Sequence, residues 1–113
     1  MTRAKKKIEI QYYVAPLRGT HYQPNGNRFS ELLLQGESLD LQREPKNKAD
    51  KNAIAVYWWP PMEIAARLHV GQGSRHKLGY IAAETAALLK GGELLAAFYQ
   101  PGGMVKIHVA VKV

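Results

Sequence analysis

Alternation of apolar and polar residues is the dominant pattern along this chain. A period of two is typical of a strand with one buried face. Six segments show this alternation or a composition typical of strands: 8–14, 38–42, 53–59, 77–81, 94–99 and 105–113. The last is the clearest, because every second residue in it is valine or isoleucine. We therefore expect a mainly β chain.

Other stretches interrupt the alternation. Residues 82–90 are rich in alanine and leucine and precede two glycines, which predicts a helix that stops there. Residues 16–27 hold several turn-forming residues and are expected to be a long loop, and 29–34 is a short helical turn or the start of a strand. Residues 61–70 fit neither period and are a third strand or an irregular excursion. The sum is a small barrel or sandwich of about six strands with a helix at one end.

Two local features carry further expectations. Gly79 interrupts a predicted strand, which indicates a β-bulge or a close approach of another backbone segment. Trp58 and Trp59 are adjacent in a predicted strand, where neighbouring side chains point to opposite faces. One of the two indoles is therefore expected to be buried and the other to cover an outer surface.

Charge narrows the class of partner. The 113 residues suit one domain, which we place at 8–113 after a basic arm at 1–7. The 16 lysines and arginines outnumber the 9 aspartates and glutamates, so the net charge is +7. Such a balance favours a polyanion, either nucleic acid or an acidic membrane surface. We expect a cytoplasmic protein without membrane insertion, because no cysteine, secretory signal or apolar run of ~20 residues is present.

The chemistry-bearing residues point to binding rather than catalysis. The four histidines lack the spacing of a zinc site, only two aspartates are present, and no P-loop or nucleophile motif occurs. We therefore expect neither enzymatic activity nor a metal or cofactor. Basic and aromatic residues are instead interleaved along the strands and loops. That mixture is typical of small barrels that stack bases on aromatic rings and hold phosphates with cations.

Residues 41–56, with the sequence LQREPKNKADKNAIAV, are the most distinctive part of the chain. They resemble the central signature of the HIRAN domain family, and a second block at 78–81 leads into the predicted helix as it does in that family. The resemblance implies a small OB-like or SH3-like β-barrel of about six strands with one or two short helices. It also implies binding of single-stranded DNA, in the best-understood members at a free 3′-hydroxyl end.

The resemblance also assigns functional residues. It implies that Asp50 accepts a hydrogen bond from the terminal 3′-hydroxyl of the DNA. The other interpretation of Asp50 is an Asx turn that orders the loop before Asn52. The two roles are compatible in one residue. We expect the remaining nucleic-acid contacts from Arg18, His21, Tyr22, Arg43, Lys51 and Tyr80. The chain departs from the family pattern at Ala49, where an aromatic residue is frequent, and at Ala82–Glu84, where a basic residue is expected.

Two functions follow as hypotheses. The first is a module that recognises single-stranded DNA or a DNA 3′ end in DNA repair or replication-fork processing. The second is a protein-interaction adaptor of a helicase or nuclease system whose catalytic chain is encoded separately, and the missing aromatic at Ala49 favours it. A small hydrolase is a weaker third hypothesis, because acidic residues are so few.

Overall fold

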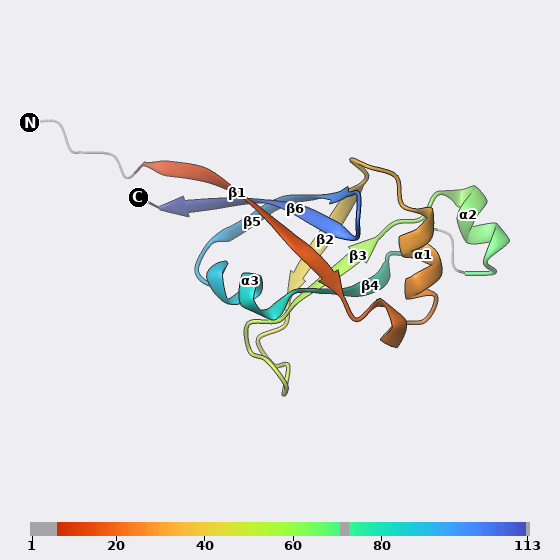
Figure 1. Ribbon diagram of the computed structural model, residues 1–113, viewed down its shortest axis with the longest axis horizontal. Helices are drawn as coiled ribbons and strands as arrows, with labels where there is room; N and C mark the ends of the chain where they lie inside the picture. The colour runs from red at the N-terminus through yellow and green to blue at the C-terminus, as the bar shows by residue number, and fades with distance from the viewer. Residues whose placement is uncertain (1–6, 71–72, 113) are drawn as a thin grey trace, which may run out of the picture.

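Six antiparallel strands form a closed barrel in the computed structural model, which describes residues 7–70 and 73–112. Around the barrel the strands follow the order β1-β4-β3-β2-β5-β6 (Figure 1). The strands are β1 Ile8–Arg18, β2 Ser38–Arg43, β3 Ile54–Trp58, β4 His76–Ile81, β5 Glu93–Gln100 and β6 Met104–Lys112. The helices are the 3-10 turn η1 Thr20–Tyr22 and the α-helices α1 Gly26–Leu32, α2 Met62–Arg67 and α3 Ala83–Leu88. The expected mainly β barrel of about six strands is confirmed, with three short α-helices rather than one or two.

The long strand β1 closes the barrel in an uneven way. It pairs with β6 over nine residues, from Ile8 opposite Lys112 to Pro16 opposite Met104. It pairs with β4 only at its end, through Leu17 and Arg18. The N-terminal part of β1 therefore runs beside β6, out from the body of the barrel (Figure 1).

The core is built from the inward residues of the strands and from α1. Ile54, Val56 and Trp58 of β3 are buried, as the alternation predicts, and Phe29 of α1 lies edge-on against the Trp58 ring at 5.5 Å. The tryptophan expectation is also confirmed. Trp58 is 2% exposed and Trp59 is 53% exposed, and the Trp59 indole donates a 2.7 Å hydrogen bond to Asp40 Oδ2.

Two expectations need correction. The predicted loop at 16–27 is largely ordered structure, because β1 continues to Arg18 and η1 and α1 follow. Pro16 does not end the strand, since its carbonyl accepts a hydrogen bond from the Ala82 amide and a proline lacks only the donor. The ambiguous stretch at 61–70 contains the helix α2. That helix has six residues and buries only Ala65, so no helical period could show in the sequence.

Two further expectations concern the basic arm at 1–7 and the lack of a membrane-spanning segment. Of the basic arm, Lys7 is exposed and residues 1–6 lie outside the described part of the chain. No helix formed by the described residues has the length and apolar character needed to cross a membrane.

Gly79 allows β1 to pair with β4, which closes the barrel. A Cβ atom at this position would overlap the backbone carbonyl oxygen of Arg18. The predicted close approach of another backbone segment is thus confirmed, and the ladder between β3 and β4 shifts register beside it, between Val56 and Tyr57. The absence of a side chain at Gly79 brings β1 onto β4.

We expect Gly79→Ala to destabilise the fold by about 1–3 kcal/mol, because the new methyl group forces the backbone of Arg18 away from β4. Urea unfolding of both proteins measures the loss. Gly36→Asn is the control, since no atom lies within 4 Å of that position and asparagine tolerates its positive φ of 85°. Equal stability of Gly79→Ala and the unmodified protein would contradict this role.

Candidate nucleic-acid interface

The loop between β2 and β3 is ordered by its own polar side chains. Asn47 Oδ1 accepts hydrogen bonds from the backbone amides of Ala49 and Asp50, at 2.9 and 3.1 Å. The amide of Ala53 donates to the Asp50 carbonyl, and the amide of Glu44 donates to the Ala53 carbonyl. The loop projects from the barrel below α3 and β4 (Figure 1). It therefore holds its tip in a defined shape although it lies outside the sheet.

Asp50 forms the Asx turn that the sequence allows. Its Oδ1 accepts a 2.8 Å hydrogen bond from the Asn52 amide. Within the described part of the chain, Oδ2 receives no hydrogen bond. The side chain is half-buried, and the neighbouring Lys51 is exposed. One carboxylate oxygen thus orders the loop, while the other is left to accept from an external donor.

A second carboxylate joins this loop to β4. Glu44 Oε1 accepts from Asn47 Nδ2 and from the Tyr80 hydroxyl, both at 2.9 Å. Glu44 Oε2 accepts from Lys77 Nζ at 3.1 Å, and the same ammonium group donates to the Tyr80 hydroxyl at 3.2 Å. A continuous chain of hydrogen bonds therefore runs from Tyr80 through Glu44 and Asn47 to the Asp50 backbone.

This network shifts the pKa of both charged members. Burial by itself raises the pKa of Glu44, but the hydrogen bonds from Asn47, Lys77 and Tyr80 outweigh it and leave the pKa below its usual value. Burial by itself lowers the pKa of Lys77, but hydrogen bonds to Glu44 and Tyr80 outweigh it and raise the pKa above its usual value. Both groups are therefore charged across the physiological pH range.

The end of β1 lies next to this network. Arg18 is the direct cross-strand partner of Tyr80, so the two residues share one face of the antiparallel pair. The chain then turns at Gly19 into η1, where the rings of His21 and Tyr22 lie 3.9 Å apart and are both exposed. Both η1 and the following α1 pack against β4. Arg18 thus flanks Tyr80 on its β1 side, and the pair of exposed rings follows in η1, which packs against β4.

Arg43 has a different environment from the other predicted residues. Its Nη2 donates to the carbonyl oxygens of Leu89 and Gly92, at 2.7 and 2.6 Å. Arg43 therefore ties the end of β2 to the turn between α3 and β5. It satisfies a carbonyl at the C-terminal end of α3 that has no partner within the helix.

The outer face of β3 and β4 contributes residues that the sequence reasoning missed. The Arg75 guanidinium lies 4.0 Å from the centre of the Tyr57 ring and contacts Gln42 of β2. Lys77 lies 5.7 Å from the same ring. Glu44 and Asn47 were also missed, although both lie inside the distinctive segment 41–56. The alternation of apolar and polar residues in β3 and β4 could have indicated Tyr57 and Lys77, because it places both on the sheet face opposite the core.

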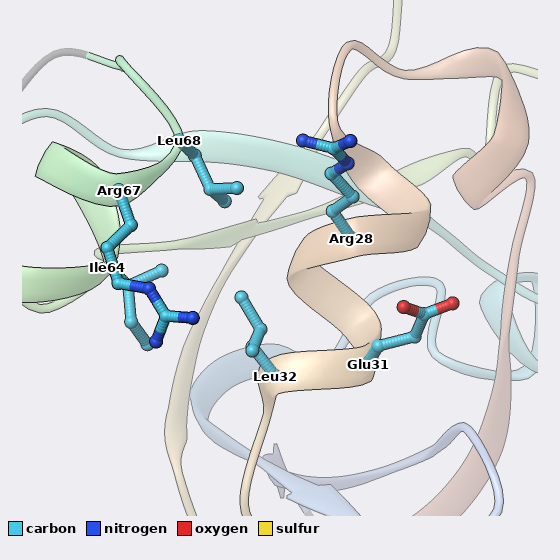
Figure 2. Close-up of a pocket in the computed structure, with 6 residues that line it drawn as sticks. All are labelled: Arg28, Glu31, Leu32, Ile64, Arg67 and Leu68. Atoms are coloured by element: carbon cyan, nitrogen blue, oxygen red, sulfur yellow. The ribbon is translucent and has the colours of Figure 1, made fainter.

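A hollow between α1 and α2 lies apart from these residues. It has a volume of about 270 Å³ and is lined by Arg28, Glu31, Leu32, Ile64, Arg67 and Leu68. Figure 2 shows the leucine and isoleucine side chains reaching into the gap between α1 and α2, with one arginine on each helix. It contains none of the predicted site residues. No group of three or more possible metal-ligating side chains occurs within residues 7–70 and 73–112.

We expect Glu44→Gln to lower the free energy of unfolding by about 1 kcal/mol at neutral pH, because hydrogen bonds to a charged carboxylate are lost. A lowered folded-state pKa means that this stability is present above pH 4.5, the usual value for the group, and is lost as pH falls through the folded-state pKa. Urea titrations should therefore show the two proteins converging in acid. Glu31→Gln, at an exposed residue of α1, is the control and should match the unmodified protein at every pH. A gap between Glu44→Gln and the unmodified protein that stays constant down to low pH would refute the assignment.

Comparison with known proteins gives independent information on the fold and the family of this chain. It is similar in structure to a crystal structure of a protein from Lactobacillus plantarum, with a TM-score of 0.56 and 23% identity over 92% of this chain and 96% of that one. At that identity the likeness shows the fold alone. No curated protein matches the sequence significantly. The model of the HIRAN domain matches residues 10–91, which include the loop between β2 and β3 and the block around Gly79. Domains of this family are nucleic-acid-binding modules, and the chain belongs to the HIRAN domain family.

Proposed function

We propose that this protein recognises single-stranded DNA at a free 3′-hydroxyl end and acts in DNA repair or replication-fork processing. The observation that carries the proposal is the state of Asp50. One of its carboxylate oxygens is held by the Asn52 amide, and the other receives no hydrogen bond from the described residues. That oxygen lies in a protein of net charge +7 and can accept a hydrogen bond from a hydroxyl.

The chemistry of a carboxylate separates two kinds of DNA end. An ionised carboxylate accepts a hydrogen bond from a 3′-hydroxyl, whereas it repels the negative charge of a 3′-phosphate or of a continuing strand. The loop holds Asp50 from both sides, because Asn47 binds its amide and Ala53 binds its carbonyl. The acceptor is therefore positioned before DNA arrives.

The other predicted residues supply affinity for the rest of the strand. Arg18, the cross-strand partner of Tyr80, and Lys51, next to Asp50 in the loop, are exposed cations and suit phosphate groups. The exposed rings of His21 and Tyr22 offer a stacking surface, which compensates for the alanine at position 49. In this proposal Arg43 acts indirectly, since it anchors the turn after α3.

The protein-interaction adaptor is the second candidate function. The hollow between α1 and α2 favours it, because its lining combines the apolar Leu32, Ile64 and Leu68 with charged side chains. Two more exposed apolar residues lie close by in sequence, Leu34 just after α1 and Met62 at the start of α2. In that case the chain delivers a separately encoded helicase or nuclease to DNA, and the barrel itself has no catalytic role. The two functions are compatible, since this hollow lies apart from Asp50.

We expect the unmodified protein to bind an oligonucleotide with a 3′-hydroxyl about tenfold or more tightly than the same oligonucleotide with a 3′-phosphate, as a hydrogen bond to a charged group implies. Asp50→Asn should abolish this preference, while its amide oxygen keeps the Asx turn to Asn52. Fluorescence anisotropy measures both, with Glu31→Gln as the control. Equal affinity of the unmodified protein for the 3′-hydroxyl and 3′-phosphate oligonucleotides would refute the end-recognition proposal.

We also expect the affinity for single-stranded DNA to fall as salt rises, because bound phosphates release counterions. Arg18→Ala and Lys51→Ala should each reduce the slope of log affinity against log salt by about 0.7. Lys112→Ala is the matched control, because this exposed lysine lies at the far end of β6. A slope that changes equally in all three variants would indicate general charge attraction rather than these contacts.

A further inference from the structure

The outer edge of β1 has backbone groups that bond to no other strand of the described residues 7–70 and 73–112. Over residues 8–14 this strand is bonded to β6 on one side, while its pairing with β4 begins only at Leu17. The N-terminal part of β1 lies clear of β4 and α3 in the ribbon view (Figure 1). Closure of the barrel thus leaves the edge of these seven residues open.

Hydrogen bonds near the end of β1 show which residues face the open side. The Leu17 amide donates to Gly103, on the β6 side, and the Pro16 carbonyl accepts from Ala82, on the opposite side. Backbone groups alternate in direction along an antiparallel strand. The N–H and C=O groups that point to the open edge therefore belong to the even-numbered residues Ile8, Ile10, Tyr12 and Val14. Among the described residues, these groups have no hydrogen-bond partner outside the β1–β6 ladder.

This edge lacks the usual protection against strand pairing. Natural proteins guard open edges with proline, a bulge, inward charges or lysine. Residues 8–14 contain no proline, glycine or lysine, and their pairing with β6 has no register shift. The even-numbered side chains are all large, apolar or aromatic and exposed: Ile8 68%, Ile10 51%, Tyr12 60% and Val14 57%. The sequence and the geometry both suit another strand here.

We propose that the open edge of β1 pairs with the same edge of a second copy of this chain, as an antiparallel two-fold contact centred on Gln11. In this register Ile8 lies opposite Val14 of the second copy, and Ile10 lies opposite Tyr12. All four outward N–H and C=O pairs are then used on both chains. A shift of one residue would put apolar side chains opposite polar ones, because the side-chain period is two.

Charge fits this arrangement. Glu9 is the only charged residue between Ile8 and Val14, and it lies opposite the neutral Tyr13 of the second copy. The lysines on the neighbouring strand, Lys106 and Lys112, pair with Val14 and Ile8. The strands that hold these lysines in the two copies lie about 14 Å apart, three strand spacings, which exceeds the Debye length of ~8 Å at physiological salt. The Lys106 ammonium lies 5.3 Å from the centre of the Tyr12 ring, and the residue opposite Tyr12 in the second copy is the neutral Ile10.

The contact leaves the proposed DNA site accessible. Arg18 is seven residues from Gln11, so the two Arg18 residues lie about 46 Å apart along the joined strands. The dimer does not depend on DNA binding, and the two respond oppositely to salt. Salt screens the repulsion between two chains of charge +7 and strengthens the dimer, whereas it weakens binding to phosphates.

Sedimentation velocity over a wide range of protein concentration, at low and high salt, tests the proposal without DNA. We expect a reversible monomer–dimer equilibrium that shifts toward dimer at high salt. Ile10→Lys should weaken it about tenfold or more, because two lysines then approach diagonally across the two-fold axis. Leu34→Lys, at an exposed apolar residue outside β1, should leave it unchanged. A protein that stays monomeric at every concentration overturns the proposal.

Crosslinking tests the register. The chain has no cysteine, so one introduced thiol reports on one position. Gln11→Cys places two thiols directly opposite at a non-hydrogen-bonded pair, about 4.5 Å between Cα atoms, within the range of a disulfide. Glu9→Cys is the matched control on the same strand face, where the thiols lie about 13 Å apart. Oxidation should link Gln11→Cys into a covalent dimer and leave Glu9→Cys monomeric. Equal crosslinking of both variants, or of neither, rejects this register.

Discussion

The approach of the Arg18 carbonyl to Gly79 is the contact on which the barrel depends. A side chain at Gly79 would occupy the space of that carbonyl, so only glycine lets β1 join β4. The junction is short, two residue pairs, and it determines both ends of β1. At the C-terminal end it sets Arg18 beside Tyr80 and directs the chain into η1. At the N-terminal end it leaves seven residues with an open edge.

Two carboxylates near this junction have different roles because their surroundings differ. Glu44 receives three side-chain donors, and these compensate for its burial and keep it charged. It is therefore part of the structure, and it orients Tyr80 and the loop through Asn47. One carboxylate oxygen of Asp50 accepts a hydrogen bond from the Asn52 amide of the same loop. Lys77 thus neutralises Glu44, whereas Asp50 keeps one oxygen that receives no hydrogen bond from the described residues.

Much of the fold could be predicted because its strands alternate strongly. The segments 53–59 and 105–113 correspond to β3 and β6, and the alanine-rich stretch 82–90 corresponds to α3. The errors arose where the local pattern was weak. Helix α2 has too few buried residues to show a period, and Pro16 resembles a strand end although its carbonyl continues the pairing.

The sequence by itself determined the mainly β fold, the basic charge and, through residues 41–56, the family and the proposal for Asp50. Tertiary structure alone decided which residues accompany Asp50. Tyr80 meets Glu44 across 36 positions of sequence, and Arg43 meets Leu89 across 46. Local pattern carries no information on such contacts, because they exist only after the barrel closes. The same closure decided which edge of β1 pairs with no strand of the described chain.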